Sequence, residues 1–215
     1  MSKLPALVFS LLIAQAPGDL NAARHTDPIP AGVAPPVAQK LAPGGTRVNA
    51  GTVTVSFWFV SALPLKTGNA APSWVDVEEG SLIGLVMLDK DVRDIRGKVV
   101  RAATYTLRYG IQPANSDHLG VSPYRDFLLL SPVAEDLDPA PRGHDGTVDL
   151  SKHTIGGSHP AVWSIDPPAA TDALSSTHTT DLGHKAVIVE VPTTREGNGS
   201  GPLRFGIVLI GKIEA

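Results

Sequence analysis

The chain has 215 residues, 42% of them hydrophobic and 18% charged, a balance that is typical of a folded domain rather than of a disordered segment. Its formal net charge is −3 and no stretch rich in Lys and Arg is visible, so nucleic acid is not expected as a partner. The sequence has no cysteine, which excludes disulfides, thiol nucleophiles, iron–sulfur clusters and blue-copper sites.

The first residues have the pattern of an export signal. Lys3 precedes an apolar run that ends at the Ala-Gln-Ala of residues 14–16, which has the small-x-small form of a cleavage site. Pro17 is unfavourable directly after such a site, so cleavage after residue 22 or 23 is the alternative. The apolar run is shorter than the ~20 residues that a membrane-spanning helix needs. We therefore expect residues 1–23 to be a signal peptide and the protein to be periplasmic or extracellular; the other interpretation is an N-terminal core strand.

Residues 24–45 are rich in proline and alanine. Proline removes a backbone donor and biases its neighbours toward extended conformations. We expect this Pro/Ala-rich segment to be a semi-rigid tether. The alternative is an extended segment that packs along the surface of the domain.

The remaining residues, 46–215, have the pattern of short β-strands. Hydrophobic and polar side chains alternate between residues 53 and 59, which is typical of a half-buried strand. Residues 82–88 are almost all apolar, as in a central strand that is covered on both faces. Further strands are expected at residues 104–109, 127–130, 161–165, 186–191 and 203–213.

The expected turns and one helix fit between these strands. Residues 89–98 form a charged connection, and the Asn-Gly pair at residues 198–199 is a turn signal within a flexible connection between the last two strands. Residues 147–155 have the pattern of a helix, and a Gly-Gly pair directly after them is a stop signal. Since 21 glycines and 19 prolines favour many short strands, we predict an all-β fold, a single antiparallel β-sandwich of about eight strands with one short peripheral helix.

The side chains of greatest chemical interest lie in and around the loop between the strands at residues 104–109 and 127–130. Arg108 precedes this loop, whose polar residues are Asp117, His118, Tyr124, Arg125 and Asp126. We expect Arg108 and Arg125 to pair with the two aspartates and so to hold the loop against the sheet. Such a loop is a structural clamp, a ligand-binding lip or both, and we favour the clamp. His159, in a later loop, is expected to share this interaction surface.

The seven histidines do not form a recognisable metal motif. No two of them have the i, i+2 spacing of a strand or the i, i+4 spacing of a helix that would place both imidazoles on one face, and there is no HExxH. A divalent metal such as zinc would need ligands from separate loops. The candidates are His118, Asp117, His144 and His159. We favour ordinary hydrogen-bonding histidines and expect no cofactor.

No catalytic motif is present either. The sequence contains neither GxSxG nor a Gly-rich phosphate loop. His118, Ser122 and Asp126 lie close together in the sequence, but a catalytic triad depends on geometry. We therefore expect a binding or structural module rather than an enzyme. The first alternative is a metal-binding protein or metal-dependent hydrolase that uses His118 and Asp117.

The second alternative is a carbohydrate-binding module. It would use Trp58, Trp74 and Trp163 as an exposed platform on which sugar rings stack. Tryptophans that pack in the core are the more common case.

Three stretches of the sequence carry a resemblance to known sequences. In chain order they are SLIGLVMLDKDVRDIRGK, TYTLRYGIQPANSDHLGVSPYRDFLLL and GGSHPAVWSI. In these stretches the chain resembles a group of uncharacterised exported bacterial β-sandwich proteins. The resemblance implies a secreted single domain and implies no activity. Our hypothesis is a secreted or periplasmic β-sandwich that binds a ligand or serves as a subunit of an envelope complex.

Overall fold

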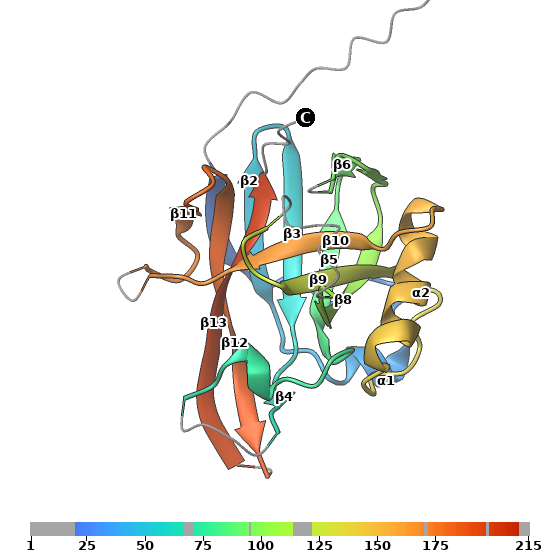
Figure 1. Ribbon diagram of the computed structural model, residues 1–215, viewed down its shortest axis with the longest axis vertical. Coiled ribbons are helices and arrows are strands. Elements are labelled where there is room, and N and C mark those ends of the chain that lie inside the picture. Colours follow the sequence, from blue (N-terminus) through green and yellow to red (C-terminus); the bar gives the residue numbers. More distant parts are fainter. Residues whose placement is uncertain are drawn as a thin grey trace, which may run out of the picture.

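The protein is mostly β, as predicted. Figure 1 shows the computed structural model, which describes residues 20–66, 71–94, 96–113, 122–169, 172–196 and 198–210. Its strands are β1 (Leu20–His25), β2 (Gly45–Ala50), β3 (Val53–Phe59), β4 (Leu63–Pro64), β5 (Leu82–Leu88), β6 (Val92–Arg93), β7 (Val99–Val100), β8 (Thr104–Ile111), β9 (Asp126–Pro132), β10 (Ala161–Asp166), β11 (Thr177–Thr179), β12 (Lys185–Arg195) and β13 (Asn198–Ile210). Its helices are α1 (Pro35–Ala38), the 3-10 turn η1 (Trp74–Asp76) and α2 (Gly143–Ile155).

One sheet contains most of these strands. Its order is β1-β2-β3-β5-β8-β9-β10-β13-β12-β11, and β4 is attached to β12. Neighbours along this path are antiparallel, whereas β4 and β12 run parallel. A separate two-stranded sheet is formed by β6 and β7. The strands predicted from alternation and from short apolar runs correspond to β3, β5, β8, β9, β10, β12 and β13, so the hydrophobic pattern located the larger part of the sheet.

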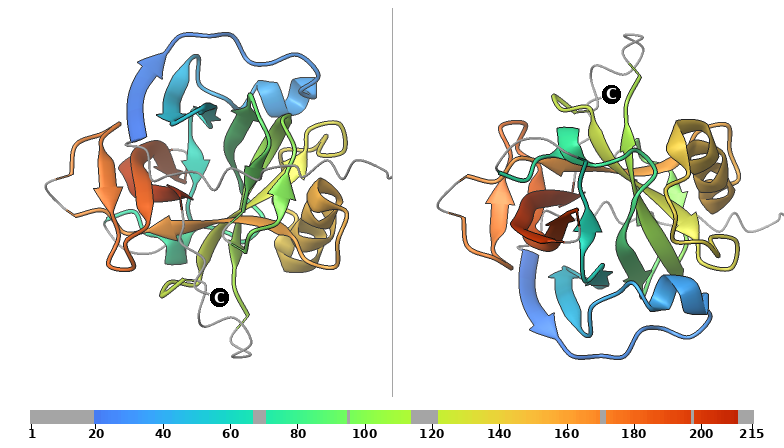
Figure 2. Two further views of the ribbon diagram at one scale, coloured as in Figure 1. Left: turned by 90° about the horizontal axis from the view of Figure 1, so that it is seen from above. Right: turned by 90° about the horizontal axis from the view of Figure 1, so that it is seen from below.

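The sheet curls on itself instead of dividing into two layers. At its ends, β1 contacts β11 and β12, and Figure 2 shows the strands wrapping around a common interior. Register shifts between β5 and β8, and at two places between β12 and β13, mark irregularities of the bulge type. Bulges bend a strand and add to the natural twist of a sheet. The predicted sandwich of about eight strands is therefore not confirmed.

The hydrophobic core fills the inside of the curl. Phe57 of β3 contacts Trp163 of β10, with ring centroids 5.9 Å apart, and Phe59 contacts Phe205 of β13 at 6.2 Å. These strands are not neighbours in the sheet, so the contacts cross the interior. Opposing parts of one sheet thus bury each other's apolar faces.

Residues 24–45, the expected tether, pack on the domain instead. Val37 and Leu41 belong to the core. The indole N–H of Trp58 donates to the backbone carbonyl of Asp27, at 3.1 Å. Because this segment covers the outer side of β3, the strand is buried on both faces, although its alternating sequence predicts a half-buried strand. A proline-rich sequence is compatible with an extended segment that packs on a domain as well as with a free tether, so the composition does not distinguish the two.

The hairpin of β12 and β13 is longer than predicted. The flexible connection expected between the last two strands is part of the ladder, in which Pro192 pairs with Pro202 and Arg195 with Asn198. The turn lies at Glu196, which has a φ of +47°, and not at the Asn-Gly pair of residues 198–199. A turn signal in the sequence is weaker than the register imposed by the buried residues of both strands.

The predicted helix is present as α2. It begins at Gly143, four residues before the expected start, and it ends at Ile155, where Gly156 follows with a φ of +61°, the left-handed conformation of a C-terminal glycine cap. The hydroxyls of Ser151 and Thr154 both donate to the carbonyl of Leu130 at 2.7 Å, which holds the helix on β9. In the described part of the chain no helix is long and apolar enough to cross a membrane.

The end of the expected signal peptide overlaps the sheet. Residues 20–23 lie in β1, where Leu20 pairs with Ala50 of β2 and is only 6% exposed. Residues 1–19, which include the apolar run, lie outside the described residues. A cut after residue 16 would leave β1 whole, whereas a cut after residue 22 or 23 would remove three or four of its six residues.

This overlap gives a prediction about truncation. A variant that begins at residue 24 should lose at least ~2 kcal/mol of unfolding free energy relative to one that begins at residue 17, because it lacks Leu20 and four of the six residue pairs of the β1–β2 ladder. Urea denaturation of the two purified variants measures the difference. Equal stabilities would show that β1 contributes nothing to the domain.

Candidate functional site

The loop between β8 and β9 is fastened at its base. Asp117 and His118 lie outside the described residues. Of the others, Arg125 donates from Nε to the carbonyl of Gln112 at 2.7 Å, and the Gln112 N–H donates back to the carbonyl of Arg125 at 2.8 Å. Tyr124 is 37% exposed. These two hydrogen bonds extend the β8–β9 pairing by one residue pair at the base of the loop.

Asp126 has a different partner from the one predicted. It accepts a hydrogen bond from the hydroxyl of Tyr109 at 2.6 Å. Burial, and next this hydrogen bond, raise the pKa of Tyr109, so the hydroxyl remains a neutral donor. Pairing of Asp126 with Arg108 is excluded by the register: Asp126 lies opposite Ile111, and so on the face of Tyr109, while Arg108 points to the other face.

Arg108 forms a buried ion pair with Asp136. Both side chains are fully buried, and the guanidinium binds the carboxylate through Nε to Oδ2 at 2.7 Å and Nη2 to Oδ1 at 2.8 Å. Arg108 also donates from Nη1 to the carbonyls of Gly80 and Ala140, at 2.6 and 2.9 Å. Asp136 receives further hydrogen bonds from Thr106 and Arg142. Arg108 is therefore a structural residue, and its predicted pairing with the aspartates of the loop is wrong for Asp126.

The ion pair gives a prediction about stability. Asp136→Asn should cost ~3–5 kcal/mol of unfolding free energy, because it leaves a buried guanidinium without its counter-charge. Glu135→Gln is the matched control, since Glu135 pairs with His153 at the surface, and it should change stability by less than ~0.5 kcal/mol. Urea midpoints of the two variants test the prediction. It fails if both variants unfold at the same urea concentration.

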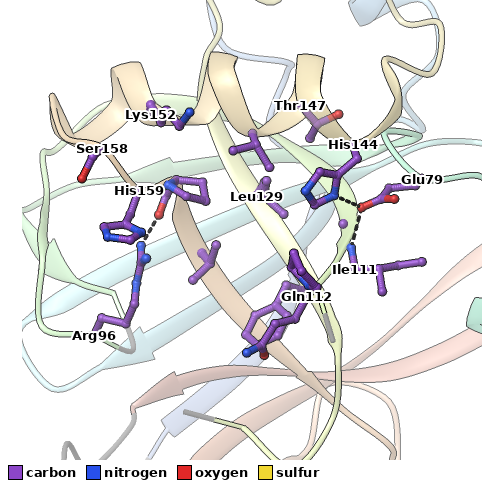
Figure 3. A pocket seen from close by; sticks show the side chains of 16 residues that line it. Glu79, Arg96, Ile111, Gln112, Leu129, His144, Thr147, Lys152, Ser158 and His159 are labelled. Atoms are coloured by element: carbon purple, nitrogen blue, oxygen red, sulfur yellow. Dashed lines mark hydrogen bonds and ion pairs between the residues drawn. The ribbon is translucent and has the colours of Figure 1, made fainter. Parts of the chain in front are cut away.

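A pocket of about 280 Å³ lies on the same outer face, between α2 and the strands β8, β9 and β10 (Figure 3). Its floor is apolar and includes Phe127, Leu129 and Val162. Phe127 and Leu129 are buried but do not belong to the main core cluster, whereas their neighbours Leu128 and Leu130 do. Alternate residues of β9 thus serve the core on one side and the pocket on the other.

A histidine and a carboxylate meet at one end of the pocket. His144, in the first turn of α2, places Nδ1 2.7 Å from Oε1 of Glu79. The same oxygen accepts the backbone N–H of Ile111 at 2.9 Å. The pair is partly exposed, with 39% of the His144 side chain and 24% of the Glu79 side chain accessible. The carboxylate thereby fixes the orientation of the imidazole ring.

The other end of the pocket carries Arg96 and His159 (Figure 3). The guanidinium of Arg96 contacts Asp94 at 3.1 Å and donates to the carbonyl of Pro160. Asp94 is buried and also accepts the backbone N–H groups of Arg96 and Lys98, at 3.0 and 2.8 Å. The turn between β6 and β7 therefore holds Arg96 in place at the pocket.

Lys152 lines the pocket from α2. Its ammonium lies 2.7 Å from the carboxylate of Asp149, and this hydrogen bond lowers the pKa of Asp149. Asp149 is not among the residues that line the pocket, and neither is Asp94. The lining itself therefore contains two permanent cations and the carboxylate of Glu79.

The predicted site residues divide between this pocket and its surroundings. His159 and the metal candidate His144 both line it, at opposite ends, whereas the other described candidates do not. Sequence reasoning singled out none of Arg96, Lys152 and Glu79 as pocket residues. The available signal for Arg96 was its position in the charged connection of residues 89–98.

The metal hypothesis gains no support from the described residues. Among them, no group of three or more histidines and acidic residues is placed to hold a metal ion. Two of the predicted ligands, Asp117 and His118, lie outside that part of the chain, and His144 pairs with Glu79.

The tryptophan platform is not formed. Trp58 and Trp163 are 1% and 3% exposed, so neither can stack on a sugar ring at the surface. Trp74 is partly buried and stacks on Tyr109, with ring centroids 4.8 Å apart. These three tryptophans therefore pack against other residues of the domain and do not form an exposed platform.

No family model, curated protein or solved structure matches the chain.

Proposed function

We propose that the protein is an exported, non-enzymatic binding module and that the pocket beneath α2 is its site for a small ligand. The observation that carries this proposal is the pocket itself, an apolar floor on a sheet with polar groups at its two ends. Small-molecule sites commonly have this composition, in which a few polar groups orient a ligand that is bound mainly by apolar contact. The signal-peptide pattern of the first residues supports the exported part of the proposal.

The scaffold is suited to binding. Although the sheet is continuous, its opposite parts pack face to face, as the layers of a β-sandwich do, because β3 packs across the interior against β10 and β13. The floor of the pocket belongs to the strands of this packed body and not to a loop. A site on strands keeps its shape when empty, which reduces the entropy lost on binding.

The arrangement of the polar groups favours binding over hydrolysis. The imidazole of His144 is held by Glu79, but the hydroxyl of Ser158 lies at the opposite end of the pocket (Figure 3). A serine nucleophile needs its base within hydrogen-bond reach. Ser158 is therefore too far from His144 for such a pair, and the hydroxyl of Thr147, on the His144 side, donates to the backbone carbonyl of Gly143.

Filling the pocket tests this proposal. Val162→Trp should place an indole over the floor and abolish the binding of small aromatic and aliphatic fragments, as detected by NMR shifts of pocket residues. Val75→Trp is the matched control, because Val75 is 76% exposed and is not part of the pocket lining, and it should bind fragments as the wild type does. The proposal is wrong if the wild type binds no fragment at the pocket, or if a folded Val162→Trp variant binds them equally well.

A further inference from the structure

The pocket is electrostatically polarised. Arg96 lies at the end that holds Ser158 and His159, and Glu79 lies at the other end, beside His144 (Figure 3). The carboxylate of Glu79 already has two hydrogen-bond partners, since its Oε1 accepts from both His144 and the Ile111 N–H. The carboxylates that pair with Arg96 and Lys152 stand outside the lining. A ligand would therefore meet a positive end, an apolar middle and a paired acid–histidine end.

The volume of the pocket limits the size of its ligand. An engineered apolar cavity of ~150 Å³ holds one benzene molecule. By that measure, the pocket of about 280 Å³ holds about ten or eleven non-hydrogen atoms. Leu129 and Val162 form the floor on which the apolar part of such a molecule would lie.

We propose that the pocket binds small amphipathic carboxylates, with the carboxylate at the Arg96–His159 end and the apolar body over Leu129 and Val162. This inference rests on the proposed function and adds the ligand class to it. Because Nη2 of Arg96 already donates to Asp94 and Pro160, a ligand carboxylate would be held by a charge-assisted hydrogen bond from Nη1, the other terminal nitrogen of the guanidinium. Both cations of the lining already have a carboxylate partner, so the site matches a single negative charge better than the double charge of a phosphate monoester.

Three probes of nearly equal size and different charge test the ligand class. They are 3-phenylpropionate, 3-phenylpropanamide and 3-phenylpropylamine, titrated into the full-length protein at neutral pH and constant ionic strength and followed by NMR. The carboxylate should bind the pocket about tenfold more tightly than the amide, and the amine should bind most weakly. Raising the salt concentration should reduce the preference for the carboxylate.

Charge-removing variants assign the preference to the positive end of the pocket. Arg96→Gln should bring the Kd of the carboxylate to within about threefold of that of the amide, while the Kd of the amide stays unchanged. Arg96 also holds the β6–β7 turn in place, so its replacement could alter the structure as well as the charge. Lys152→Gln, on the surface of α2, is therefore a second variant, and it too should weaken the binding of the carboxylate relative to that of the amide. Arg101→Gln is the control, because Arg101 is an exposed arginine that pairs with Asp91 outside the pocket lining. In this variant the ratio of the Kd of the amide to the Kd of the carboxylate should not change.

The possible outcomes separate this inference from the proposed function. Equal binding of the carboxylate and the amide at the pocket would overturn the ligand class and leave the pocket as a binding site. Carboxylate binding that persists in the Val162→Trp variant would place the ligand elsewhere and overturn the inference. If none of the three probes shifts pocket resonances, and the fragment screen is also negative, both the inference and the proposed function are wrong.

Discussion

The buried ion pair between Arg108 and Asp136 is the interaction on which the outer face of the sheet depends. Both charges are removed from water, which is tolerated because they pair with each other and each makes further hydrogen bonds. The guanidinium binds the carbonyls of Gly80, just before β5, and Ala140, just before α2. One arginine of β8 thereby ties together two segments that are far apart in the sequence.

The same contacts bring the polar end of the pocket together. Glu79 directly precedes Gly80, and His144 lies in the first turn of α2, so fixing these two backbone segments places the carboxylate beside the imidazole. Gly80 has a φ of +85°, and a Cβ there would lie 2.7 Å from the backbone nitrogen of Arg142. The close approach of the segments therefore requires glycine. A structural ion pair that does not line the pocket thus determines the geometry of the pocket.

The parts of the fold that could be predicted are those set by local pattern. Alternation located β3, and the glycine after α2 marked its end. The partner of Arg108 could not be predicted in this way, because Asp136 is 28 residues away and the face on which each lies depends on the β8–β9 register. The packing of residues 24–45 was missed for a similar reason: proline-rich sequence specifies an extended backbone but not whether a sheet lies beneath it.

The pocket could not be predicted from the sequence, because its charged residues lie in common local patterns that do not indicate a site. Arg96 and Glu79 lie in turns, where charged side chains are usually solvated, and only the tertiary fold shows that both face one pocket. The sequence does contain one indication of it. Residues 127–130 of β9 are continuously apolar, which means that both faces of the strand are covered. The curl of the sheet accounts for one face, with Leu128 and Leu130 in the core. Phe127 and Leu129, on the other face, are covered by elements outside the sheet, among them α2, and this cover leaves them only 6% and 4% exposed.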